Sequence, residues 1–295
     1  MVQQNCALCE RSDFAVVYQE NFDVQLLDEK IFSARRLPDR IHYRIVRCNR
    51  CGLIYSNPIL EVEKINAWYR KSFVSYDAQV ENLVRTYGHY LQQVARYHAE
   101  KERLLEIGCG NGFFLDEAQR QGYAEVYGVE PGEKSVEKAP PELRPHILVD
   151  VIRPGLFPNE YFDVICCFQT LDHLPDPNAV LASCRGLLKK NGVALFFNHN
   201  VGAWSAKLLG RASPIIDIEH TYLYDKRTMR ALFEKHGFTV REVNSAFNIH
   251  NLSYWVRLFP LPKKMKLFLL RLLQRPGLDV RLKMYAGNLV LFAQK

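Results

Sequence analysis

The sequence predicts an α/β protein in which helices cover a largely parallel sheet. A short apolar strand is expected at residues 103–107. It runs directly into a helix through three glycines at alternate positions, Gly108, Gly110 and Gly112. Further apolar strands alternate with helical segments over residues 125–200, which is the pattern of βαβ units. A hydrophobic content of 48% in 295 residues is enough for one full α/β core and a smaller second unit.

The glycine turn is typical of a nucleotide-binding site. Glycine lets the backbone approach a ligand closely, and the free N–H groups at a helix start favour negative charge. The spacing is E-x-G-x-G-x-G, with Glu106 two residues before the first glycine, and it differs from the dinucleotide fingerprint G-x-G-x-x-G. A second acid, Glu130, follows the next strand 18 residues after Gly112. This separation is near the one expected for a carboxylate that binds a ribose.

The run LLEIGCGNG at residues 104–112 resembles motif I of the class I S-adenosylmethionine (SAM) methyltransferases. The resemblance implies a Rossmann-like sheet of seven strands with helices on both faces, in which the last strand, 288–293, is antiparallel. It also implies that the glycine turn holds the methionine part of SAM, that Glu130 binds the ribose and that Asp150 binds the adenine. The candidate cofactor-binding residues are Glu106, Gly108, Cys109, Gly110, Gly112, Phe113, Glu130, Pro131, Asp150, Val151, Phe168 and Gln169.

Two CxxC pairs predict a structural zinc site. Cys6 and Cys9 are separated from Cys48 and Cys51 by 38 residues. Four thiolates suit tetrahedral zinc and leave no open position on the ion, so the metal would hold the fold together rather than act in catalysis. Two unrelated pairs, or a redox pair, are the alternatives. Eight cysteines in a chain with no recognisable secretory signal favour a reducing compartment.

We expect three parts in the chain. Residues 1–57 form a small zinc-ribbon-like β module, residues 58–102 form a helical cap or linker, and residues 103–295 form the methyltransferase domain. The first part resembles the zinc module of bacterial class I methyltransferases associated with sugar and other specialised metabolism. Strands are favoured at 14–18, 25–27 and 42–46 within it.

The linker is predicted to hold helices at 61–69 and 80–101. Tyr69 and Tyr76 are candidates to line the substrate side of the cofactor cleft. Packing of these rings between the first module and the core is the alternative.

Histidines at the predicted C-terminal ends of strands are candidates for a catalytic base. A hydroxyl acceptor must lose a proton when it is methylated, and histidine accepts protons near neutral pH. His173 and His220 are the first choices. Tyr222 and Asp172 are candidates to orient the substrate or the base, and His199 is a candidate for substrate contact. A structural role is the alternative for each histidine.

The net charge of +7 is concentrated near the C-terminus. Residues 241–295 contain ten Lys/Arg and two Asp/Glu, so residues 1–240 sum to −1. This distribution argues against a nucleic-acid-binding surface over the whole molecule. An insertion at 247–286 contains a basic amphipathic helix at 263–275, which could lie on an anionic membrane or over a lipid-linked acceptor, pack on its own domain, or form a dimer contact.

The sequence therefore predicts a zinc-stabilised SAM-dependent methyltransferase that acts on a small or lipid-carrier-linked metabolite. A sugar hydroxyl is the favoured acceptor. Because no apolar run has membrane-spanning length, we expect a cytoplasmic protein with at most peripheral contact at the inner face of the membrane. An rRNA or tRNA methyltransferase and a non-catalytic SAM-binding scaffold are the alternatives. The acceptor and the oligomeric state do not follow from the sequence, because acceptor loops vary within one fold.

Overall fold

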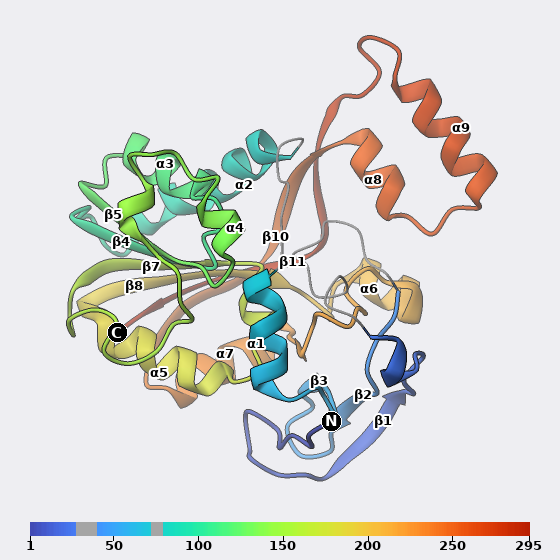
Figure 1. Ribbon diagram of the computed structural model, residues 1–295, viewed down its shortest axis with the longest axis horizontal. Coiled ribbons are helices and arrows are strands. Elements are labelled where there is room, and N and C mark those ends of the chain that lie inside the picture. The colour runs from blue at the N-terminus through green and yellow to red at the C-terminus, as the bar shows by residue number, and fades with distance from the viewer. Residues whose placement is uncertain (28–39, 72–78) are drawn as a thin grey trace.

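The computed structural model describes residues 1–27, 40–71 and 79–295. Tyr76, predicted to line the cleft, lies outside these residues. The described strands form a seven-stranded sheet and a four-stranded sheet, and the C-terminus lies at the end of the last strand of the large sheet (Figure 1).

The large sheet confirms the predicted seven-stranded α/β fold. Its strand order is β10-β11-β8-β7-β4-β5-β6. The strands are β4 (Arg103–Ile107), β5 (Glu125–Val129), β6 (Ile147–Leu148), β7 (Phe162–Phe168), β8 (Leu188–His199), β10 (Thr239–Asn251) and β11 (Arg281–Gln294). β4 pairs in parallel with β5 and β7, whereas β11 is antiparallel to both of its neighbours, as predicted for the last strand.

Helices cover both faces of this sheet (Figure 1). The principal ones are α2 (Val80–Gln93) and α3 (Phe113–Arg120) on one face, and α5 (Pro177–Leu187) and α7 (Lys226–Lys235) on the other. Neighbouring strand residues alternate between the two cores: Leu104 and Cys166 pack with the first pair, and Leu105 and Cys167 pack with the second. Cys166, Cys167 and Cys184 are fully buried and serve as small hydrophobic core residues.

The remaining helices are short and lie outside these two layers. They are α1 (Val62–Lys71), α4 (Glu133–Val136), α6 (Trp204–Leu209), α8 (Leu252–Leu258) and α9 (Lys263–Leu273), with short 3₁₀ turns η1 (Val24–Leu26), η2 (Val94–Arg96), η3 (Arg144–His146), η4 (Leu171–His173) and η5 (Gly210–Ala212). No helix within the described ranges is both long and apolar enough to cross a bilayer.

The second sheet joins three N-terminal strands to a short strand near residue 222. It has the order β1-β2-β3-β9, with β1 (Phe14–Tyr18), β2 (Ile45–Cys48), β3 (Ile54–Ser56) and β9 (Tyr222–Leu223). Tyr55 of β3 is paired with Tyr222 of β9. The N-terminal strands therefore share a sheet with a segment from the methyltransferase half of the chain.

Two local expectations for the N-terminal half were wrong. The strand expected at residues 25–27 is replaced by η1, because the side chain of Asp23 accepts a hydrogen bond from the backbone N–H of Gln25 and caps a helical turn. The helix expected at 80–101 ends at Gln93. The turn η2 follows it, and the carbonyls of Lys101 and Glu102 accept hydrogen bonds from the N–H groups of Ala124 and Glu125 at the start of β5.

The insertion is an arm rather than a separate unit. Asn248–Asn251 of β10 pair with Arg281–Met284 of β11, so both strands continue beyond the sheet. α8 and α9 stand at the end of this two-stranded arm, away from α3 and α5 (Figure 1).

Candidate active site

A cavity of about 410 Å³ lies at the C-terminal ends of the parallel strands. Ligands bind at this edge in open α/β sheets. Nine predicted cofactor-binding residues line it: Glu106, Gly108, Phe113, Glu130, Pro131, Asp150, Val151, Phe168 and Gln169. The other three, Cys109, Gly110 and Gly112, lie in the turn between β4 and α3.

The glycine turn is held open by its backbone geometry. Gly108 has φ +75°, and a Cβ atom there would lie 2.5 Å from Oγ1 of Thr170. Glu130 is bound to the turn, because its Oε2 accepts a hydrogen bond from the N–H of Gly110 at 2.9 Å and its Oε1 accepts one from Gly132 at 2.8 Å. Burial raises the pKa of Glu130, and these two donors oppose the rise. Because a Cβ atom at position 108 would clash with Thr170, only glycine leaves the space beside this turn open.

Glu106 is a buried acid next to this turn. Its Oε2 has no hydrogen-bond partner within the described part of the chain. Burial, and then the nearby charge of Glu130, raise the pKa of Glu106 well above its usual range. An unpaired buried carboxylate beside a cavity fits a cationic group, such as the amino group of a methionine moiety. The residues present therefore fit SAM.

Two further parts of the cofactor region are a polar wall at Asp150 and an aromatic wall at Phe168. Asp150 accepts a hydrogen bond from the N–H of Val151 at 2.8 Å and forms an ion pair with Arg153 at 2.8 Å. Phe168 stacks on Tyr87 with ring centroids 4.2 Å apart. Asp150 follows β6 and Phe168 ends β7, so the two residues form walls on opposite sides of the turn after β4.

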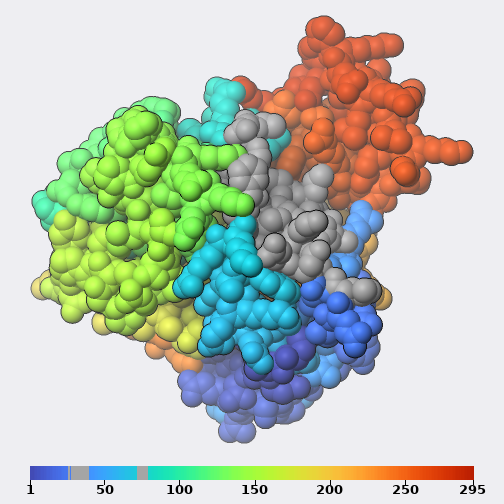
Figure 2. Space-filling model, viewed as in Figure 1, coloured from blue at the N-terminus to red at the C-terminus, as the bar shows by residue number. Residues whose placement is uncertain are grey.

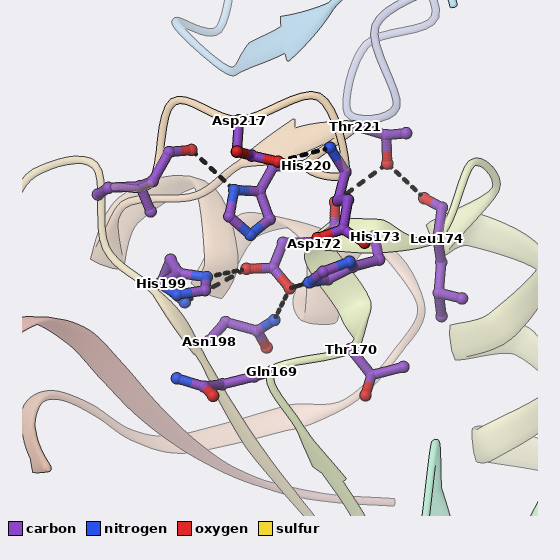
Figure 3. Close-up of polar contacts among 12 residues, drawn as sticks. Gln169, Thr170, Asp172, His173, Leu174, Asn198, His199, Asp217, His220 and Thr221 are labelled. Carbon is purple, nitrogen blue, oxygen red and sulfur yellow. Dashed lines mark hydrogen bonds and ion pairs between the residues drawn. The ribbon is translucent and has the colours of Figure 1, made fainter. Parts of the chain in front are cut away.

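At the acceptor end, Asp172 and His199 form a close pair (Figure 3). Oδ2 of Asp172 lies 2.6 Å from Nδ1 of His199, and Oδ1 accepts a hydrogen bond from Asn198 at 3.0 Å. Burial by itself would raise the pKa of Asp172, but His199 beside it holds this pKa well below its usual range. The carboxylate of Asp172 is therefore ionised and accepts a hydrogen bond from Nδ1–H of His199, so Nε2 is the ring nitrogen of His199 that is left to act on an acceptor.

His220 and His173 lie beside this pair. The ring centroid of His220 is 4.6 Å from that of His199 and 4.8 Å from that of His173. Nδ1 of His220 donates to the carbonyl of Ile215 at 2.8 Å, and burial, followed by the charge of His199, lowers the pKa of His220. The hydroxyl of Tyr69 lies 3.1 Å from Nδ1 of His173. Tyr69, His173 and His220 line the cavity together with His199.

The four predicted zinc ligands also come together, away from this cavity. The sulfur atoms of Cys6 and Cys51 are 3.3 Å apart, and those of Cys9 and Cys48 are 3.4 Å apart. All four sulfurs lie within 4.8 Å of one another. Tetrahedral Zn–S bonds of about 2.3 Å imply sulfur separations of about 3.8 Å, so the cluster has the size of a zinc site.

A sequence model of the family described as "Methyltransferase domain" matches residues 76–243. The chain belongs to this family. The match includes both acids of the cofactor region and the Asp172–His199 pair, and it confirms the predicted SAM-dependent methyltransferase domain.

Curated relatives of this methyltransferase share part of its length. The ubiquinone biosynthesis O-methyltransferase of Histophilus somni (strain 2336) is 34% identical over 151 residues, which cover 46% of this chain and 62% of that protein. The protein of the same name from Pasteurella multocida (strain Pm70) is 32% identical over 148 residues, 42% of this chain and 59% of that protein. The chain thus spans about three fifths of the length of these relatives.

A solved structure shows the same fold. It is the crystal structure of a protein assigned as a methyltransferase from Bacillus halodurans C-125, with a TM-score of 0.51 and 15% sequence identity. The superposition covers 70% of this chain and 98% of that chain.

Tyr222, a candidate to orient the substrate, is not among the residues that line the cavity. Its hydroxyl donates a hydrogen bond to Oε1 of Gln4 at 3.3 Å, and its ring stacks on Tyr55. Several cavity residues were not predicted from the sequence: Tyr87, Thr170, Asp217, Glu219, His250 and Trp255. They come from α2, η4, the loop before β9 and the arm, and no local motif marks them.

Proposed function

We propose that this methyltransferase transfers a methyl group from SAM to a hydroxyl oxygen of a small or carrier-linked metabolite. The observation that carries the proposal is the Asp172–His199 pair, because its His199 lines the same cavity as Gly108 and Glu130. The names of the relatives, ubiquinone biosynthesis O-methyltransferase, support oxygen as the acceptor atom. When bound, SAM supplies a methyl group activated by a positively charged sulfur.

The cofactor end binds and orients. Glu106 offers an unpaired carboxylate oxygen to the amino group of the methionine moiety. Glu130, anchored by the backbone of Gly110 and Gly132, presents its carboxylate to the ribose hydroxyls. Asp150, oriented by the N–H of Val151, accepts a hydrogen bond from the adenine amine, and Phe168 supplies an apolar wall. Such fixed partners align the reacting atoms and thereby lower the barrier.

The acceptor end removes a proton. Nε2 of His199 takes the proton of the acceptor hydroxyl, while Asp172 holds the ring in the required tautomer. The imidazolium that forms is stabilised by the buried carboxylate of Asp172, which stays ionised because its pKa is low. Neutral His220 and the Tyr69–His173 pair position the acceptor beside this base.

The acceptor should carry an apolar portion. The far end of the cavity is lined by Pro214, Ile215, Trp255, Leu258 and Phe259. Burial of apolar surface contributes about 25 cal/mol per Å², so this end favours an aromatic or aliphatic body next to the hydroxyl. A sugar hydroxyl, favoured by the resemblance of the N-terminal module, fits this lining best when the sugar is linked to an apolar carrier.

We further propose that Cys6, Cys9, Cys48 and Cys51 bind one structural Zn²⁺. The size of the sulfur cluster supports this assignment. Four thiolates would fill the coordination sphere, so the ion would take no part in methyl transfer.

The function is tested by incubating the purified protein with SAM carrying an isotopically labelled methyl group. The acceptor panel holds phenols, glycosides and lipid-linked sugars, and the same compounds with the hydroxyl already methylated are the matched controls. The expected result is label on an oxygen of at least one acceptor and none on the controls. Label on nitrogen or carbon would overturn the proposal, and so would tight SAM binding with no transfer to any hydroxyl, which is the behaviour of a scaffold.

A further inference from the structure

Exposed large apolar side chains are concentrated on one part of the described surface. Of fourteen such residues, nine lie on α6 or between residues 252 and 285: Trp204, Leu208, Phe259, Met265, Leu267, Phe268, Leu278, Val280 and Tyr285. α9 has no buried residue, and Phe268 is 65% exposed. Packing of α9 on its own domain, one of the roles considered for this helix, does not account for these exposed side chains.

The same segment carries the excess positive charge of the chain. Residues 252–285 contain eight Lys/Arg and one acid, Asp279, a balance of +7 that equals the net charge of all 295 residues. Both carboxylate oxygens of Asp279 are hydrogen-bonded within the arm, where they accept from the backbone N–H and the hydroxyl of Ser253. The segment therefore presents positive charge that the arm itself does not neutralise.

Cations and apolar side chains share the exposed face of α9. Lys264, Leu267, Phe268 and Arg271 are three or four residues apart, so they are neighbours on one helix face, and all four are exposed. Helices that lie in a membrane interface combine Lys and Arg with Phe, Leu and Trp in this way. Figure 2 shows residues 252–285 projecting at the upper right from the rest of the molecule, which leaves this face accessible.

We propose that α6, α8 and α9 form a docking surface for an anionic phospholipid bilayer. Charge complementarity selects this partner, because α6, α8 and α9 contain six Lys/Arg and no Asp/Glu, and their exposed Phe268, Leu267 and Trp204 match an apolar layer below negative headgroups. In Figure 1 all three helices lie on the right-hand side of the view, away from α3, α4 and α5. The docked protein is bound at the membrane surface and does not span it.

The docking surface continues into the cavity. Ser205 and Leu209 of α6, together with Trp255 and Leu258 of α8, line the cavity that holds His199. Nε1 of Trp204 donates a hydrogen bond to the carbonyl of Tyr285 at 3.1 Å, which joins α6 to the base of the arm. An acceptor with an apolar body can therefore pass from the bilayer to His199 between apolar walls. This entry route rests on the proposed function, whereas the docking itself does not.

Co-sedimentation of the full chain with vesicles tests the docking. Vesicles containing phosphatidylglycerol are compared with vesicles of phosphatidylcholine alone, at low and high salt. We expect binding to the anionic vesicles that weakens with salt. The double variants Leu267→Ser/Phe268→Ser and Lys264→Glu/Arg271→Glu should each lower the bound fraction about tenfold. The matched controls are Val16→Ser and Lys134→Glu/Lys190→Glu, which change exposed residues outside the arm.

Two results would overturn the docking: equal binding of the wild-type protein to both kinds of vesicle, or wild-type binding by both arm variants. A dimer that the arm variants dissociate, with no vesicle binding by the wild-type protein, would assign the surface to a second copy of the chain instead. An assay of the methylation of a water-soluble acceptor, without vesicles, distinguishes failure of the docking proposal from failure of the proposed function. The arm variants should retain this activity, and its absence from the wild-type protein would count against the proposed function alone.

Discussion

The hydroxyl of Ser56 donates a 2.9 Å hydrogen bond to the backbone carbonyl of His220. The two residues are 164 positions apart in the sequence, and both are buried. Next to them, Tyr55 of β3 pairs with Tyr222 of β9. The strand that follows the second CxxC pair is thus bonded to the loop that carries a cavity histidine. This contact gives the N-terminal module an influence on the acceptor site.

The first prediction concerns the cysteine cluster. Cys48→Ser should lose the bound zinc and lower the melting temperature, because one of four ligands is removed from the ion. The KM for the acceptor should rise more than the Kd for SAM, since β3 contacts the His220 loop and not the glycine turn. Metal analysis, thermal melting and steady-state kinetics measure the three quantities.

Cys184→Ala is the control for this prediction, because Cys184 is buried in α5 outside the cluster. It should keep one zinc per chain. A Cys48→Ser protein that retains zinc and the wild-type acceptor KM would contradict the assignment.

The second prediction concerns the ribose-binding acid. Glu130→Ala removes the acceptor for the N–H groups of Gly110 and Gly132 as well as the carboxylate that faces the cavity. The Kd for SAM should rise by about 10- to 100-fold, roughly 1.4–2.8 kcal/mol. Calorimetric titration measures it, and Glu133→Ala, an exposed residue of the neighbouring α4, is the control that should bind SAM normally. Equal affinities of both variants would reject this role of Glu130.

The third prediction concerns pH. The pKa of Glu106 in the folded protein is raised by burial, so the folded state holds a proton that the unfolded state releases above about pH 4.3. Stability contributed by this group is therefore present at low pH and is lost as pH rises. Glu106→Gln should raise the melting temperature of the SAM-free protein more at pH 8 than at pH 5, while it weakens SAM binding.

Melting curves across this pH range test that expectation. A difference between wild type and Glu106→Gln that does not change with pH would show that the carboxyl of Glu106 keeps an ordinary pKa.

The fourth prediction concerns Tyr222, which the sequence suggested as a residue that orients substrate. The structure places its hydroxyl against Gln4 rather than in the cavity lining. Tyr222→Phe should therefore leave kcat and KM near the wild-type values and cost at most about 1 kcal/mol of stability. A loss of kcat without a loss of stability would contradict this prediction and would support a role of Tyr222 in orienting the substrate.

Local motifs allowed much of the cofactor region to be predicted. Gly108 follows β4 directly and Glu130 follows β5 directly, so a strand–turn–helix pattern is enough to bring them to one edge of the sheet. The fold class and the antiparallel last strand were predicted with the same information and the family resemblance. The packing of Cys166 and Cys167 into the cores on opposite faces of the sheet likewise follows from the period of a strand.

The acceptor end could not be predicted in the same way. Asp172 and His199 are 27 residues apart, and their contact depends on how η4 packs against the end of β8. The loop with His220 is held there by Thr221, whose N–H and hydroxyl both donate to the carbonyl of Asp172. Such pairings depend on tertiary packing, and neither hydrophobic periodicity nor a local motif encodes them. The partner of the exposed face of α9 could not be predicted either. The sequence pattern of an amphipathic helix is the same whether its apolar side contacts protein or lipid.

The most direct test of the account is the kcat of His199→Asn, measured beside the Kd of the same protein for SAM. Loss of the proposed base should lower kcat by about 100-fold or more and leave SAM binding unchanged. His89→Asn, an exposed histidine of α2 outside the cavity lining, is the control and should retain both values. A His199→Asn protein that methylates its acceptor at the wild-type rate would contradict the central claim that this histidine takes the proton of the acceptor hydroxyl.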